Sequence, residues 1–194
     1  MTDLALGVRR AALGARVLAV VLGAVLVALA AQVSIPLPGT PVPMTLQPLA
    51  VLLVGGLLGA RLGAASMVLY LALGIAGLPV FTPTVPLFGI ARLLGPTGGY
   101  LLAYPVAAWV VGWLVTPGLA PGVNPPYWGR VAVGVLCGLL LIHVGGLAQL
   151  AILTGNLSGA ARLGTLPFLV GDLGKLAVAV AVLTKLTPQV RARL

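Results

Sequence analysis

The chain has 194 residues, of which 60% are hydrophobic and only 7% are charged, and its mean hydropathy is +1.19. Soluble domains carry about 25% charged residues, so this composition excludes an ordinary soluble fold and predicts an integral membrane protein. The net charge of +9 does not indicate nucleic-acid binding, because the cations stand singly at the ends of apolar segments. The single cysteine, Cys137, excludes a disulfide within the chain and a cysteine metal cluster.

The hydrophobic residues form six separate runs of membrane-spanning length. Six helices of about 20 residues and their loops use the whole chain and leave no room for a soluble domain. We therefore predict an all-α membrane protein, a single integral membrane domain over residues 1–194 that folds as a six-transmembrane-helix bundle. The predicted spans are approximately 17–33, 44–60, 62–78, 98–115, 131–153 and 166–186.

The first predicted span follows a segment that carries Arg9, Arg10 and Arg16. A cleaved secretory signal is an alternative, because residues 28–30 read Ala-Leu-Ala, but the residues just beyond also fit the membrane fold. Small residues recur here at four-residue spacing, which lets another helix approach closely. This packing is either internal or a partner-binding face; the residues are Ala11, Ala15, Ala19 and Gly23, with Ala24 and Ala28.

Two long connections are rich in proline. Residues 34–48 have proline at 36, 38, 41 and 43 and no charge, so we expect a stiff loop without strand or helix ladders that folds over the bundle as a cap. Residues 79–97 form a longer, aromatic loop that contains Arg92.

The distribution of cations predicts the orientation. With six spans, the side that holds both termini has eight cations, namely Arg9, Arg10, Arg16, Arg61, Arg130, Lys185, Arg191 and Arg193. The opposite side has two, Arg92 and Arg162. Both termini are therefore predicted to be cytosolic in a multi-pass protein of the cell membrane, and Arg92 and the start of the sixth span lie in its outer half.

The sixth predicted span contains Asp172 and Lys175, although Asp3 is the only other acidic residue of the chain. Three residues along a helix turn by roughly 300°, so both side chains leave nearly the same face. An ionised group at the bilayer centre costs about 2.5–3.5 kcal/mol on insertion scales, and such groups usually pair, face the bundle interior and mark a ligand or ion path. Asp172 offers an acceptor and Lys175 a donor to a small ligand. The guanidinium of Arg92 can bind a carboxylate through two parallel N–H donors. The alternatives are an internal salt bridge that locks helix packing and, for Arg92, a side chain that snorkels to the interface.

The other polar residues favour structural roles, and no enzyme motif is present. His143 lies in the middle of the fifth span and is expected to hydrogen-bond a neighbouring helix, because a proton relay needs several carboxylates or histidines in series. Gly174-Lys175 is not the end of a phosphate loop, because Leu176 replaces the required Ser or Thr. No catalytic residue is predicted, so nucleotide-driven transport would need another subunit.

Four ordered blocks carry a resemblance to a known family: SIPLPGTPVPMTLQPLAVLLVGGLLGARLGAAS at 34–66, LYLALGIAGLPVF at 69–81, LLGPTGGYL at 93–101 and LPFLVGDLGKL at 166–176. The chain resembles BioY, the biotin-binding substrate subunit of energy-coupling-factor (ECF) transporters. The resemblance implies capture of biotin from the outside, and a membrane complex with a transmembrane coupling protein and two ATPase subunits. Biotin is then the substrate, no cofactor or metal is implied, and only the partner subunits use ATP.

The resemblance also implies roles for individual residues. The Asp and Lys of the family's sixth helix align with Asp172 and Lys175, and its loop arginine with Arg92. By their chemistry, we assign Asp172 to a ureido N–H, Lys175 to the ureido oxygen and Arg92 to the valerate carboxylate, and the reversed orientation of the ligand is the alternative. The predicted substrate-binding set is completed by Thr82, Tyr100 and Gln47, and the residues predicted to contact the coupling protein are Ala15, Ala19, Gly23, Ala24 and Ala28.

One segment departs from the family pattern. The loop FTPTVPLFGIARLL at 81–94 lacks the glycine-rich form associated with the family, which leaves open the loop residue that joins Arg92 at the carboxylate. Two alternative functions also stay open: a substrate subunit for another vitamin, and a non-transport membrane scaffold in which the Asp–Lys pair is structural.

Overall fold

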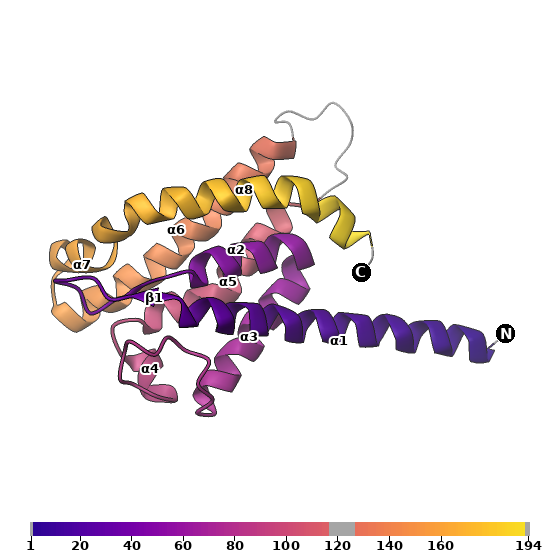
Figure 1. Ribbon diagram of the computed structural model, residues 1–194, viewed down its shortest axis with the longest axis horizontal. Helices are drawn as coiled ribbons and strands as arrows, with labels where there is room; N and C mark the ends of the chain where they lie inside the picture. Colours follow the sequence, from indigo (N-terminus) through magenta and orange to yellow (C-terminus); the bar gives the residue numbers. More distant parts are fainter. Residues whose placement is uncertain (1, 117–126, 193–194) are drawn as a thin grey trace.

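The computed structural model describes residues 2–116 and 127–192, and their side chains from residue 13 onward. These ranges are mostly helical (Figure 1). The elements in chain order are α1 (Thr2–Gln32), β1 (Ser34–Ile35), β2 (Met44–Thr45), α2 (Gln47–Leu58), α3 (Ala60–Ile75), α4 (Ile90–Leu94), α5 (Gly98–Leu114), α6 (Tyr127–Thr154), α7 (Leu157–Gly164), a 3-10 helix (Leu166–Phe168) and α8 (Leu169–Arg191).

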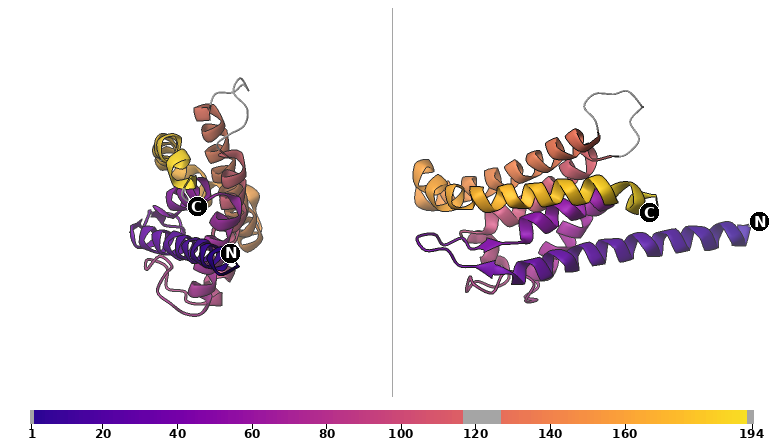
Figure 2. Two further views of the ribbon diagram at one scale, coloured as in Figure 1. Left: turned by 90° about the vertical axis from the view of Figure 1, so that its right-hand side faces the viewer. Right: turned by 45° about the horizontal axis from the view of Figure 1, so that its top comes forward.

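The long helices run side by side along one axis of the molecule. The beginning of α1 and the end of α8 lie at the same end, and the β1–β2 connection and α7 lie at the other (Figure 1). The N-terminal part of α1 extends beyond the rest of the bundle (Figure 2). This end-to-end arrangement places α4, the start of α5 and the start of α8 near the β1–β2 connection.

Helix α5 lies in the interior and packs against α2, α3 and α6, while α8 packs against α2 and α6. Two of these contacts require glycine, since a Cβ at Gly55 of α2 would collide with the carbonyl of Ala108 on α5, and a Cβ at Gly99 of α5 would collide with the carbonyl of Gly145 on α6. Small residues thus allow the close backbone approach that is typical of membrane helices. Large apolar side chains of α1, such as Leu13, face outward.

Each predicted span corresponds to a helix, with different limits. By length and composition, three described segments could each cross a membrane: Leu13–Gln32, Tyr127–Thr154 and Leu157–Arg191. Helices α2, α3 and α5 are apolar but have only 12, 16 and 17 residues. The predicted span 98–115 agrees within a residue with α5, whereas α1 begins well before residue 17 and α8 continues past residue 186 to Arg191.

The connection at 34–48 corrects one prediction. We expected no strand ladder there, but Ser34 pairs with Thr45 and Ile35 with Met44 in an antiparallel ladder. The ladder forms because the prolines lie outside the four paired residues and Gly39, with φ +81°, supports the reversal. Helix α2 therefore begins at Gln47, three residues after the predicted start of the second span.

The turn after α2 corrects a second prediction. Gly59 makes this turn with φ +86°, so α3 begins at Ala60 and Arg61 lies in its first helical turn rather than in the connection.

Candidate ligand-binding site

A cavity lies beneath the β1–β2 connection, between the beginnings of α2, α5 and α8 and the α3–α4 connection. All six residues of the predicted substrate-binding set line it: Gln47, Thr82, Arg92, Tyr100, Asp172 and Lys175. The lining also includes residues that the sequence analysis did not assign to a site, among them Thr45, Thr97, Tyr104, Ile142, His143 and Phe168. The bundle thus joins segments from both halves of the chain in one site.

One end of the cavity is a buried ionic cluster. The Nζ of Lys175 donates to Oδ1 of Asp172 at 2.8 Å, and their side chains are only 8% and 6% exposed. The other carboxylate oxygen, Oδ2, lies 2.7 Å from Nε2 of His143 on α6. Asp172 belongs to the first turn of α8, where the helix dipole favours a negative charge. The cluster leaves carboxylate lone pairs and ammonium hydrogens for a ligand.

His143 confirms one prediction and extends it. The sequence analysis expected a histidine hydrogen-bonded to a neighbouring helix, and the contact to Asp172 joins α6 to α8. The imidazole also lines the cavity, which its position in the middle of an apolar run did not indicate. Only the packing of α6 against α8 reveals this second role.

The other end of the cavity is a buried guanidinium. Arg92 is 1% exposed and donates from Nη1 to the carbonyl of Val85 at 2.6 Å and from Nη2 to the carbonyl of Thr82 at 2.9 Å. Its Nε has no hydrogen-bond partner, and the ring of Phe81 lies 6.0 Å from its Cζ. The snorkelling alternative for Arg92 is therefore wrong.

The electrostatics of Arg92 favour an anion. Burial lowers the pKa of this guanidinium from its ordinary value, but arginine keeps its proton in proteins. Within the described side chains, the guanidinium has no salt bridge to a carboxylate. A buried cation that is held only by backbone carbonyls is stabilised when a negative group reaches it.

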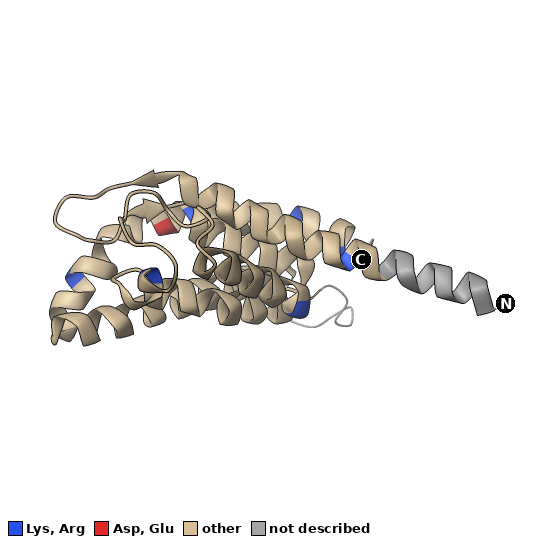
Figure 3. Cartoon of the chain, turned by 90° about the horizontal axis from the view of Figure 1, so that it is seen from below, with Lys and Arg blue, Asp and Glu red and all other residues tan. Residues whose placement is uncertain are grey.

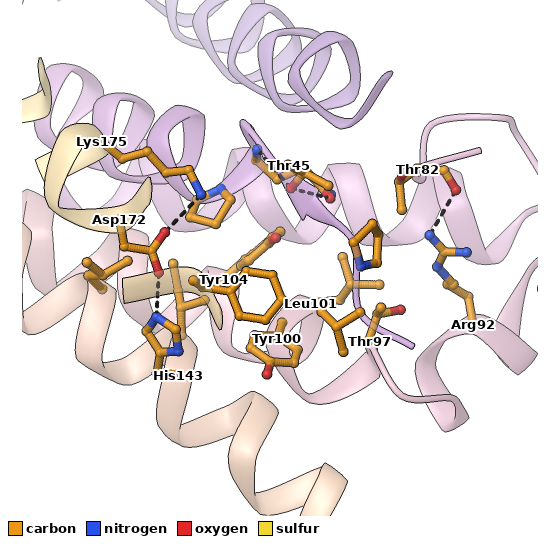
Figure 4. A pocket seen from close by; sticks show the side chains of 17 residues that line it. Thr45, Thr82, Arg92, Thr97, Tyr100, Leu101, Tyr104, His143, Asp172 and Lys175 are labelled. Carbon is orange, nitrogen blue, oxygen red and sulfur yellow. Dashed lines mark hydrogen bonds and ion pairs between the residues drawn. The ribbon is translucent and has the colours of Figure 1, made fainter. Parts of the chain in front are cut away.

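Aromatic and aliphatic side chains separate the two charged ends. Figure 4 shows Asp172, Lys175 and His143 on one side of the cavity, Arg92 and Thr82 on the other, and Tyr100, Tyr104 and Leu101 between them. The hydroxyl of Tyr100 donates to the carbonyl of Gly164, so this residue offers mainly its ring to the cavity.

Three polar side chains line the cavity between these ends, and they differ in whether their hydrogen-bonding atoms already have protein partners. The side-chain amide of Gln47 donates to the hydroxyl of Tyr70 at 2.6 Å. The hydroxyl of Thr45 donates to Oε1 of Gln47 at 3.2 Å. The Oγ1 of Thr97 is buried without a protein partner and is free for a ligand. Within the described ranges, no group of three or more His, Cys, Asp or Glu side chains forms a metal site.

The small residues of α1 divide between two environments. Gly23 and Ala24 are buried, and a Cβ at Gly23 would meet the hydroxyl of Ser66 on α3. These two residues pack within the chain, which is the internal alternative of the sequence analysis. Ala15 is exposed and Ala19 and Ala28 are half-buried, while the side chain of Ala11 lies outside the described part.

Comparisons with known proteins agree with this geometry. Residues 5–192 match the model of the BioY family. The probable biotin transporter BioY of Pyrococcus horikoshii is 39% identical over 164 residues, which cover 83% of this chain and 89% of that protein. The biotin transporter BioY of Thermotoga maritima is 35% identical over 161 residues, with the same coverage of 83% and 89%.

A solved structure has the same fold. The crystal structure of the S-component for biotin from an ECF-type ABC transporter superposes with a TM-score of 0.76 and 26% sequence identity, and the match covers 88% of this chain and 89% of that one. The family match over nearly the whole length, the identities of the relatives and this superposition agree with one another, and the chain belongs to the BioY family.

Proposed function

We propose that this protein is the substrate-specific subunit of an ECF-type vitamin importer and that it captures biotin from the outer side of the cell membrane. The observation that carries the proposal is a single cavity with the Asp172–Lys175 pair at one end and the unpaired cation of Arg92 at the other. These ends suit a ligand whose head both donates and accepts hydrogen bonds, whose middle is apolar and whose tail is negative.

Biotin has this order of groups. Its ureido ring presents two N–H donors, which Asp172 accepts, and one carbonyl, to which Lys175 donates. The fused rings and the valerate chain lie against the aromatic wall of α5. The valerate carboxylate reaches Arg92, with Thr97 as a neutral donor beside it. Thr82 contributes its backbone carbonyl to the orientation of Arg92.

The arrangement of the helices supports a six-span topology with both termini in the cytosol. The beginning of α1 and the end of α8 lie at one end of the bundle (Figure 1), as an even number of spans requires. In Figure 3, the lysines and arginines whose side chains are described are blue and the acidic residues red. Arg9, Arg10 and Arg193, which contribute to the predicted positive side, lie outside these side chains.

Helix α2 is the shortest of the proposed spans. Its 12 residues cover about 18 Å, which is less than the roughly 30 Å of a hydrocarbon core. The β1–β2 connection continues from its N-terminus and covers the remaining depth above the cavity. Irregular backbone is tolerated at membrane depth where it lines a cavity, as Val42, Pro43 and Thr45 do here.

As a transporter subunit rather than an enzyme, the protein leaves energy supply to its partners. We propose a complex with a transmembrane coupling protein and two ATPase subunits, which alone use ATP. Ala15, Ala19 and Ala28 on α1 are the proposed contacts to the coupling protein, because they are not fully buried within the chain.

Equilibrium binding to the detergent-purified chain tests the proposed substrate. Isothermal titration with biotin should give saturable one-site binding, and the mass of a copurified ligand should equal that of biotin. A thermal-shift panel of other vitamins is the control. Stabilisation by a different vitamin would assign the cavity to that vitamin, and stabilisation by none would support the scaffold alternative.

A further inference from the structure

The carboxylate of Asp172 is held from two helices. One oxygen accepts from Lys175 on the same helix, α8, and the other contacts His143 on α6 (Figure 4). Each carboxylate oxygen has its own partner, and these two contacts together hold the plane of the carboxylate more firmly than the pair within α8 alone. His143 is therefore the residue that ties the acceptor to the rest of the bundle.

The surroundings of the imidazole define its tautomer. An ionised carboxylate only accepts hydrogen bonds, so Nε2 carries a hydrogen. The other nitrogen, Nδ1, is buried without a hydrogen-bond partner. His143 therefore donates one hydrogen bond from Nε2 to Asp172.

We propose that His143 is a positioning residue for ligand recognition: it holds the Asp172 carboxylate ionised and oriented toward the cavity, so that its free lone pairs accept the N–H groups of a cyclic urea. This inference rests on the proposed function. The inference extends the proposed function, because the family resemblance assigns no role to His143.

The proposal depends on the groups that face the carboxylate. Lys175 faces it from α8 and His143 from α6, while the phenols of Tyr100 and Tyr104 face the same cavity from α5. Removal of the imidazole leaves Lys175 as the only side chain among these residues that donates to the carboxylate. The charged form of Asp172 then loses one of its two hydrogen bonds, which makes its protonation easier.

Three variants separate this role from simple packing. His143→Gln keeps a donor near the position of Nε2, His143→Asn is polar but too short to reach Asp172, and His143→Leu is apolar and close in volume. Val144→Ala is the control on the same helix, because its side chain is 61% exposed. Biotin affinity is measured from pH 5 to pH 8 by titration calorimetry, together with the thermal stability of each ligand-free variant.

We expect His143→Leu and His143→Asn to weaken biotin binding by about tenfold, as for the loss of a hydrogen bond to a charged group. The pH at which half of the affinity is lost should rise in both. His143→Gln should stay within about threefold of the parent, and Val144→Ala should be unchanged. In an Asp172→Asn background, His143→Leu should have no further effect, because the imidazole acts through that carboxylate.

Equal affinity of parent and His143→Leu at every pH would overturn the inference, as would a His143→Gln variant as impaired as His143→Leu. Either result leaves the proposed function intact, because the parent still binds biotin. A parent chain that does not bind biotin overturns the proposed function and this positioning role together.

Discussion

Asp172 and Lys175 lie three residues apart on one helix, and their ion pair of 2.8 Å stays within α8. A salt bridge that locks helix packing would join two helices, whereas the Asp172–Lys175 pair lies within one helix. The helix-to-helix contact of the cluster comes from His143 instead. Asp172 thus takes part in a contact between α6 and α8, and both charged residues also line the cavity, which leads to specific predictions.

The first prediction concerns the acceptor. Asp172→Asn should weaken biotin binding by about 100-fold, because the amide replaces a charged acceptor with a group that also presents donors to the ureido N–H groups. Titration calorimetry at pH 7 measures the loss. Lys185→Gln is the control, since Lys185 is an exposed charge on the same helix. Parent-like affinity in Asp172→Asn would remove this residue from the site.

The second prediction concerns the donor. Lys175→Ala should lower biotin affinity and thermal stability together, because it leaves a buried carboxylate that has only His143 as a partner. Removal of one member of a buried ion pair costs about 3–5 kcal/mol, and the remaining contact from His143 places our expectation near the lower value. Differential scanning calorimetry with and without biotin measures both effects. Lys185→Ala should change neither, and an equally stable Lys175→Ala would contradict the expected burial cost.

The third prediction concerns the carboxylate end. The parent should bind biotin methyl ester much more weakly than biotin, because the ester has no negative charge for Arg92. In Arg92→Gln, biotin should bind about as weakly as the ester. Arg92→Lys should not restore the difference, since one ammonium cannot replace a fork that contacts two carbonyls and a ligand. Arg162→Gln is the matched control, with an exposed arginine. If Arg92→Gln still distinguishes acid from ester, the carboxylate lies elsewhere.

The fourth prediction concerns pH. Protonation of Asp172 removes the acceptor, so biotin affinity should be constant near neutral pH and fall as the solution becomes acidic. Arg92 does not contribute to this change: burial lowers its pKa, but the ordinary value lies far above the tested range and the guanidinium stays charged. Binding measured from pH 4 to pH 8 gives the profile. The carboxylate of biotin also becomes protonated at the acid end of this range, so the affinity of Asp172→Asn should fall there as well. The acceptor role predicts a steeper fall in the parent, and identical acid profiles of the two proteins would exclude Asp172 as the pH-dependent acceptor.

The sequence predicted the elements and the charged ends of the site better than the local geometry. The limits of α5 followed from one apolar run between Gly98 and Val115, and the convergence of Arg92 with Asp172 followed from counting cations and spans. The ladder between Ser34 and Thr45 could not be predicted, because two-residue strands have no detectable periodicity. Likewise, apolar composition does not show that helix α2 begins at Gln47.

Side-chain contacts between distant segments were also beyond the sequence. The pairing of His143 with Asp172 depends on the rotation of α6 against α8, which the spacing within either helix does not define. The internal packing of Gly23 depends on Ser66 of α3. The sequence does not distinguish a small residue on an internal face of a helix from one on an external face. The physical reason is common to these cases: a contact between helices is defined by the relative placement of two elements.

The fifth prediction concerns the end of the bundle opposite the cavity. Arg191 on α8 donates from Nη2 to the carbonyls of Gly56 and Gly112 at 2.7 and 2.9 Å, and from Nε to Gly56 at 3.1 Å. These carbonyls belong to the last turns of α2 and α5, where no helical N–H remains to pair with them. One guanidinium therefore joins the ends of three helices.

Arg191→Ala should lower the free energy of unfolding by about 1.5–3 kcal/mol, the range for hydrogen bonds to a charged group, and leave biotin affinity unchanged. Arg191→Lys should recover only part of the stability, because an ammonium cannot place its donors in the same plane. Thermal unfolding in detergent measures the stability, and Lys185→Ala is the control. A stable Arg191→Ala variant with weakened biotin binding would contradict this separation, because it would show that the two ends of the bundle are coupled.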